Sequence, residues 1–214
     1  TENNGESILS DVAKAVDNKL AQEAISKDDV QGIGIGVPGP VDSQGVVHRC
    51  VNLGWGVVNV AEELGNLTGL TIKVGNDANV AALGEMWQGG AKGSKDVIMV
   101  TLGTGVGGGI IVDGKVVAGF NGAGGEIGHI TVNNDEIEAC NCGQYGCLEQ
   151  YTSATGIVRL AKRKLAKSSE ETSIREIPNL TAKDVFDAAK AGDAAALEIT
   201  EEFGAYLGQA LVNL

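Results

Sequence analysis

The sequence has no hydrophobic run long enough to cross a bilayer and no excess of basic residues. No stretch reaches the roughly 18 consecutive apolar residues of a transmembrane helix, and the opening TENNGES has no basic or apolar region of a signal peptide. We therefore expect a cytoplasmic protein without a membrane partner. The 16 Lys and Arg are scattered among 28 Asp and Glu, for a net charge of −12, so no nucleic-acid partner is expected.

Proline and cysteine are scarce, whereas glycine is abundant. Three prolines stand against 32 glycines, which are expected at tight turns and close backbone approaches. With 43% hydrophobic and 21% charged residues, the chain can bury one sizeable core or two modest ones, so disorder is excluded. Three of the four cysteines fall within eight residues, and in a cytoplasmic protein this clustering indicates metal before disulfides.

Strand and helix signals alternate along the first half of the chain. Apolar residues at every fourth position from Ile8 to Leu20 predict an amphipathic helix. The expected elements that follow are a strand over 30–37, a helix over 60–64, a strand over 71–74, a helix in NDANVAALGEMW, a strand over 96–102, a turn in GTGVGGG and a hairpin over 110–117. From Thr155 onward the pattern is helical, with a capped helix after Thr181. We predict an α/β protein with domains 1–95 and 96–214.

The segment NDAN at residues 76–79 ends a strand and begins a helix. There the positive end of the helix dipole would keep Asp77 ionised and able to accept a hydroxyl proton. The alternative is that Asp77 or Asn79 only caps the helix.

The segment TLGTGVGGG offers backbone N–H groups that no side chain obstructs. Such a run can hold phosphate oxygens without a positive side chain. A glycine-rich hairpin turn is the alternative, although it needs fewer glycines.

A histidine and the three clustered cysteines form a set of four metal ligands. These are His129, Cys140, Cys142 and Cys147. Three thiolates and one imidazole complete a closed tetrahedral site, which is typical of structural zinc. The alternative is a buried group of reduced cysteines with a core histidine. Cys50 lies far upstream and is interpreted as packing. Glu126 and Glu149 flank the site, where carboxylates could accept hydrogen bonds from sugar hydroxyls.

Six motifs together resemble the ROK family of sugar kinases and repressors, over nearly the whole chain. They are GVPGPVD, NLGW, NDANVAALGE, TLGTGVGGG, GGEIGHITV and CNCGQYGCLE, in the family's order and approximate spacing. The resemblance implies an actin-like, hexokinase-like ATPase fold whose two α/β lobes close over sugar and ATP. In detail it is similar to glucokinases of the Gram-positive type, which implies glycolytic phosphorylation of glucose, or of a related hexose, by a homodimer that uses ATP, Mg²⁺ and structural Zn²⁺.

The resemblance also implies roles for individual residues. Asp77 would be the general base. The sugar ligands would be Asn52, Asn76, Asp77, Glu126, His129 and Glu149. The phosphates of ATP would face the glycine segment through Thr104, Gly105, Gly107, Gly108 and Gly109. His129 would both bind zinc and contact the sugar.

The chain departs from the family pattern at both ends. A strand and DxGxT-type phosphate loop are expected before Thr1, and a glycine-rich adenosine segment after Leu214. We therefore expect a portion of a longer protein that is inactive by itself. Two alternatives stay open: a kinase for mannose, fructose or N-acetylmannosamine, and a sugar-responsive repressor. A zinc-stabilised interaction module without catalysis ranks below both.

Overall fold

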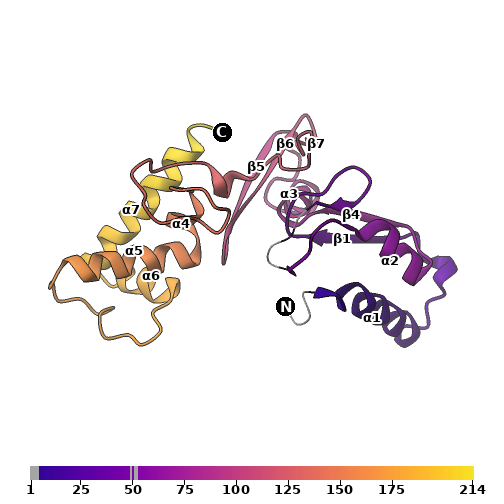
Figure 1. Ribbon diagram of the computed structural model, residues 1–214, viewed down its shortest axis with the longest axis horizontal. Helices are drawn as coiled ribbons and strands as arrows, with labels where there is room; N and C mark the ends of the chain where they lie inside the picture. Colours follow the sequence, from indigo (N-terminus) through magenta and orange to yellow (C-terminus); the bar gives the residue numbers. More distant parts are fainter. Residues whose placement is uncertain (1–4, 49, 51–52) are drawn as a thin grey trace. The chain divides into compact units, whose positions relative to one another are not determined.

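The computed structural model describes residues 5–48, 50 and 53–214 of the chain (Figure 1). These residues form two compact units, which are described separately. The first unit draws on residues 1–99 and 109–125, and the second on residues 100–108 and 126–214. Strands β5 (Val97–Leu102) and β6 (Val106–Val112) contribute residues to both units. The domain boundary near Lys95 stays a prediction.

The first unit is built around a parallel pair of strands. Its elements are α1 (Ile8–Gln22), the 3-10 helix η2 (Lys27–Asp29), β1 (Ile33–Val37), β2 (Val46–Val47), β3 (Val58–Asn59), α2 (Val60–Thr68), β4 (Ile72–Asn76), α3 (Asp77–Gln88) and β7 (Lys115–Val116). Strands β1 and β4 are paired in register from Ile33 opposite Ile72 to Val37 opposite Asn76. Their carboxyl ends therefore lie side by side, and α3 starts at that edge.

Helices α1 and α2 lie next to each other and pack on the β1–β4 pair (Figure 1). Ala13 of α1, Leu64 of α2 and Ile72 of β4 form one buried cluster. The predicted four-residue periodicity of α1 is thus confirmed, because its apolar stripe meets this core. A second cluster includes Cys50, which is buried beside Trp55 and Val60, as packing requires.

Three local predictions need correction. Residues 27–29 form η2, and the Ser26 side chain caps this helix by accepting the N–H of Asp28. The strand expected from residue 30 therefore begins only at Ile33. Helix α2 continues beyond residue 64 to Thr68, where Gly69 ends it in the left-handed conformation at φ 73°. The glycine segment is not one long turn, because β6 already begins at Val106. The hairpin is confirmed: Asp113 and Gly114 have φ of 50° and 73°, as a two-residue hairpin turn requires.

The second unit is helical around an irregular loop. Its elements are the 3-10 helix η4 (Ile127–His129), α4 (Glu149–Thr152), α5 (Ala154–Lys167), α6 (Ala182–Lys190) and α7 (Ala194–Leu211). Helix α7 packs against α4, α5 and α6 (Figure 1). Thr181 begins α6 in a capping box with Asp184, which confirms the predicted cap. The ring of Phe203 meets that of Phe186 edge-on at 5.5 Å between centroids. None of the helices in the described ranges is both long and apolar enough to cross a membrane.

Two leucines of α2 test the core of the first unit. Leu64 is completely buried, whereas Leu67 is 50% exposed on the same helix. We expect Leu64→Ala to lower the free energy of unfolding by about 2–5 kcal/mol, because it leaves a cavity. Leu67→Ala, the matched control, is expected to cost less than about 1 kcal/mol. Equal losses in chemical denaturation would show that Leu64 does not form the core described.

Candidate functional site

Asp77 lies at the carboxyl edge of the β1–β4 pair, as the first residue of α3. The side chain is exposed, and its Oδ1 accepts a hydrogen bond from the N–H of Ala78 at 2.8 Å. Catalytic groups of α/β proteins commonly project from this edge.

The N-cap of α3 is Asn76, not Asp77 or Asn79. Asn76 Oδ1 accepts the N–H of Asn79 at 3.0 Å, and Asn76 Nδ2 donates to the carbonyl of Gly39 at 3.1 Å. The capping alternative for Asp77 is therefore wrong, because the preceding residue already has that role. Asn76 also ties α3 to the proline-containing loop after β1.

The glycine turn, defined here as Gly103–Gly105, closes by a hydrogen bond from the N–H of Gly103 to the carbonyl of Gly105. The N–H of Val106 donates to Glu149 Oε2 at 3.0 Å. A Cβ at Gly105 would lie 2.4 Å from the same carboxylate oxygen, so a larger residue there would displace the Glu149 side chain from its present position.

The other predicted phosphate ligands, Gly107, Gly108 and Gly109, lie inside strand β6. A Cβ at Gly109 would lie 2.5 Å from the Cβ of Ala82 on α3, so close packing explains that glycine. Of the predicted phosphate ligands, only Thr104 and Gly105 lie in irregular backbone, within the glycine turn, where they could face a ligand. Asn52 lies outside the described residues.

The four predicted metal ligands come together in the second unit. The ligand atoms of His129, Cys140, Cys142 and Cys147 all lie within 4.8 Å of one another. Two antiparallel bridges, Thr131 with Cys147 and Ala139 with Tyr145, fold the loop on itself. This loop, residues 130–148, is called the metal loop below.

The spacing of the ligand atoms fits a tetrahedral ion. Sulfurs bound to one zinc at about 2.3 Å lie about 3.8 Å apart. Here Cys142 Sγ is 3.6 Å from Cys147 Sγ, and Cys140 Sγ is 3.9 Å from His129 Nδ1. Burial and the neighbouring thiols raise the pKa of Cys147, so a cation would be needed to hold this sulfur as a thiolate. Soft sulfur donors with one imidazole favour zinc.

The flanking residues take defined positions around the cluster. The carbonyl of Glu126 accepts the N–H of His129 at 3.1 Å, which sets the first turn of η4. Because His129 Nδ1 faces the sulfurs, its Nε2 is left for another partner. Glu149 Oε1 lies 4.0 Å from Cys140 Sγ, so one carboxylate contacts both the glycine turn and the metal cluster.

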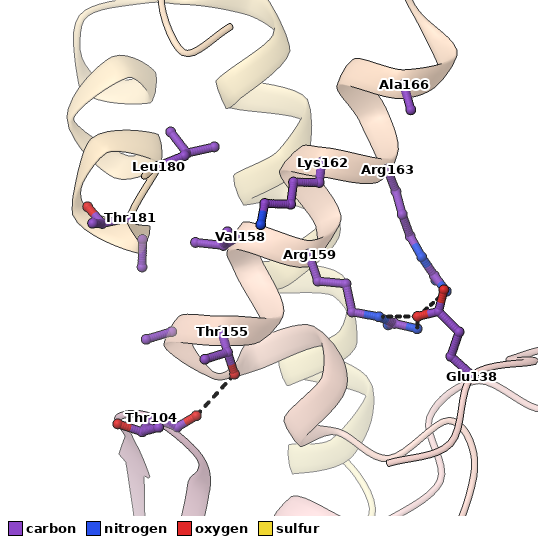
Figure 2. A pocket seen from close by; sticks show the side chains of 12 residues that line it. Thr104, Glu138, Thr155, Val158, Arg159, Lys162, Arg163, Ala166, Leu180 and Thr181 are labelled. Atoms are coloured by element: carbon purple, nitrogen blue, oxygen red, sulfur yellow. Dashed lines mark hydrogen bonds and ion pairs between the residues drawn. The ribbon is translucent and has the colours of Figure 1, made fainter. Parts of the chain in front are cut away.

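A groove of about 740 Å³ opens beside the glycine turn. The N–H of Ala154 donates to the carbonyl of Gly103, and Thr155 Oγ1 donates to the carbonyl of Thr104 at 3.1 Å (Figure 2). The positive end of α5 therefore adjoins the turn. Val158 and Leu180 add apolar surface farther along. The volume of the groove is within the range of small-molecule binding sites.

Sequence reasoning missed a buried carboxylate beside this groove. The side chain of Glu136 is 1% exposed and lies 2.7–2.8 Å from Arg159 and Arg163. Hydrogen bonds from Arg163, and then from Tyr151, hold the pKa of Glu136 far below its usual range, although burial opposes them. Burial, followed by the bond to Glu136, raises the pKa of Tyr151 to about 12. The sequence signal was faint: two arginines four residues apart on one helix, and no hint of their partner.

Comparison with known proteins decides the family. The sequence profile of the ROK family matches residues 1–214. The chain belongs to the ROK family. A glucokinase from Halalkalibacterium halodurans is 45% identical over 214 residues, which cover 98% of this chain and 65% of that protein. The ROK chain thus spans about 65% of the length of this curated relative.

Solved structures of the family share the fold. A ROK glucokinase from Streptomyces griseus, in complex with glucose and AMPPNP, superposes with a TM-score of 0.77 at 34% identity, over 95% of this chain and 67% of that one. A ROK transcriptional regulator, a homologue of the E. coli MLC protein, has a TM-score of 0.84 at 29% identity, over 97% of this chain and 52% of that one. The expected actin-like α/β fold of ROK hexokinases and glucokinases is confirmed.

The metal cluster predicts about one zinc ion per chain after purification without chelators. Cys147→Ala removes a buried ligand and is expected to leave less than about a tenth of an equivalent. Cys50→Ala, a buried cysteine of the first unit, is the control and should retain the metal. Elemental analysis measures all three proteins. A zinc-free wild type that gains none on addition would contradict the prediction.

Proposed function

We propose that the protein phosphorylates glucose at its 6-hydroxyl with ATP, as a glucokinase. The observation that carries the proposal is the 45% identity to a glucokinase across 98% of this chain. Support also comes from the similar Streptomyces griseus glucokinase, whose structure holds glucose and AMPPNP. ATP would enter as its Mg²⁺ complex.

Asp77 is the proposed general base. Its exposed carboxylate begins α3, and Asn76 rather than Asp77 is the N-cap of that helix. In the reaction, Asp77 accepts the proton of the sugar 6-hydroxyl while the oxygen attacks the γ-phosphorus. The bond from the γ-phosphorus to the bridging oxygen breaks, and ADP leaves.

The proposed sugar ligands are Asn52, Asn76, Asp77, Glu126, His129 and Glu149. Carboxylates suit this task because they accept strong, charge-assisted bonds from hydroxyl groups. His129 would present Nε2 to a hydroxyl, since Nδ1 faces the cysteines. Zinc, when bound to these residues, would supply rigidity, because a four-ligand site is closed to substrate.

For the nucleotide, we propose the groove beside the glycine turn. The phosphates would meet Thr104 and the backbone around Gly105, near the positive end of α5. The nucleoside would lie along the apolar wall formed by Val158 and Leu180. Gly107, Gly108 and Gly109 were expected to bind phosphate, and within β6 they would act by shaping the strand.

Two other functions remain alternatives to this proposal. A kinase for mannose, fructose or N-acetylmannosamine would use the same carboxylates, because these sugars share part of the hydroxyl pattern. A sugar-responsive repressor is represented by the regulator with a TM-score of 0.84, although its identity is 29% against 45% for the glucokinase. We further propose a cytoplasmic homodimer that acts in glycolysis, without a nucleic-acid or membrane partner.

Asp77→Asn tests the proposed base in the intact protein. Asparagine keeps the shape of the side chain but cannot take the proton, so kcat is expected to fall about a hundredfold or more. Glucose affinity should change much less, because the loss occurs in the transition state. Asp113→Asn, at the exposed hairpin turn, is the control and should keep wild-type kcat. Wild-type kcat for Asp77→Asn would remove Asp77 from the mechanism, and a rise in KM alone would make it a sugar ligand.

A further inference from the structure

Glu136 connects the metal loop to helix α5 through a buried cluster of charges. Its carboxylate receives two hydrogen bonds from Arg163, at 2.9 and 2.8 Å, and one from the hydroxyl of Tyr151 at 2.5 Å. Arg159 Nη2 adds an ion pair at 2.7 Å. The backbone N–H of Glu138 donates to Oε1 at 2.9 Å, so both oxygens of the carboxylate accept two hydrogen bonds.

The two arginines also form part of the wall of the groove (Figure 2). Both guanidinium groups turn toward Glu138, and Arg159 Nε donates to Glu138 Oε2 at 2.9 Å. Lys162 points the other way, toward Leu180 and Thr181 (Figure 2). Two cations of this wall, Arg159 and Arg163, are therefore paired with glutamates of the metal loop. The third, Lys162, points toward the opposite side of the groove.

The same stretch of the metal loop leads directly to a metal ligand. Glu136 and Glu138 precede Cys140, and the carbonyl of Glu138 accepts Gln150 Nε2 at 2.9 Å. This short segment is thus fixed on one side by α5 and on the other by the cysteine cluster. The few residues between these two anchors therefore connect the ion pairs of α5 to the cysteine cluster.

Removing the charge of Glu136 would take from Arg159 and Arg163 the buried carboxylate that holds their side chains in the groove wall. Glu138 has a side chain that is 61% exposed, and alone it cannot neutralise two guanidinium groups. The arginines would then repel each other and leave their present positions. The groove would lose a defined surface on the side that Arg159 and Arg163 occupy.

We propose that Glu136 is a positioning residue for nucleotide binding: it holds Arg159 and Arg163 in the groove wall and couples that wall to the metal loop. The proposal rests on the proposed function, which assigns the nucleotide to this groove. Glu136 itself touches no substrate. Because Arg159 and Arg163 line the groove, the main effect of Glu136 falls on the nucleotide, whose affinity then depends on the occupancy of the metal cluster.

The test uses Glu136→Gln in the intact protein, with Asp135→Asn as the matched control. Asp135 is an exposed neighbour on the same loop, so its variant removes the same charge without opening the cluster. For Glu136→Gln we expect the KM of ATP to rise about tenfold, in the range seen when residues that support a binding site are lost. The kcat and the KM of glucose should stay within about twofold of wild type. Either role lowers the melting temperature because a buried ion pair is lost, so the KM of ATP decides: a purely structural role would leave it unchanged.

Calorimetry with the non-hydrolysable analogue AMPPNP measures the coupling directly. Zinc removal should weaken binding about tenfold in wild type. In Glu136→Gln it should add less than about twofold, because the connection is already broken. If the two losses multiply, or if Glu136→Gln binds the analogue like wild type or more tightly, the proposal is overturned.

A second variant and an activity control make the outcome decisive. Glu136→Asp keeps the charge but is too short to reach both arginines, so it should fold and show an intermediate loss. If Glu136→Gln does not fold, an unchanged KM of ATP in Glu136→Asp overturns the proposal. Absence of glucose-dependent ATP consumption in wild type would instead reject the proposed kinase. If wild type is active and the KM of ATP is unchanged in Glu136→Gln, only the positioning role of Glu136 is rejected.

Discussion

The second unit depends on a carboxylate that is almost completely withdrawn from water. Glu136 is stabilised only because two guanidinium groups and a phenol surround it, and removing one partner of such a buried pair typically costs about 3–5 kcal/mol. Tyr151 in turn stacks on Tyr206, with ring centroids 4.1 Å apart, so the charge cluster also connects α4 to α7. The helices, the metal loop and the groove thus share one set of contacts. That sharing explains why a loop with little regular structure can hold a fixed shape.

The metal cluster and the glycine turn are linked by a second carboxylate. Glu149 accepts the N–H of Val106 and approaches Cys140, and a side chain at Gly105 would displace this carboxylate. A rigid cluster therefore supports the backbone that we propose for the phosphates. In the first unit Asn76 has the comparable role, since it caps α3 and leaves the carboxylate of Asp77 exposed. In each unit a neighbouring side chain thus positions the proposed catalytic or binding group through hydrogen bonds to the backbone.

The sequence predicted the features that depend on neighbouring residues and missed those that depend on distant ones. The stripe of α1, the cap at Thr181 and the turn at Asp113-Gly114 are encoded within a few residues, and the structure confirms them. The clustering of the cysteines also predicted that the four ligands come together, and their ligand atoms do lie close to one another. The cap at Asn76 was misplaced by one residue because Asn and Asp are equally good caps. The pair of Glu136 with Arg163 could not be predicted, because 27 residues separate them and neither belongs to a motif.

The proposed glucokinase activity is tested most directly by the ATP-dependent phosphorylation of a panel of sugars by the intact wild-type protein. We expect glucose to have the highest kcat/KM, exceeding mannose, fructose and N-acetylmannosamine by about tenfold or more, since a site built for one hydroxyl pattern leaves polar groups unpaired with another. Phosphoryl transfer to none of these sugars, together with DNA binding that a sugar releases, would contradict this activity and place the protein among the regulators of its family.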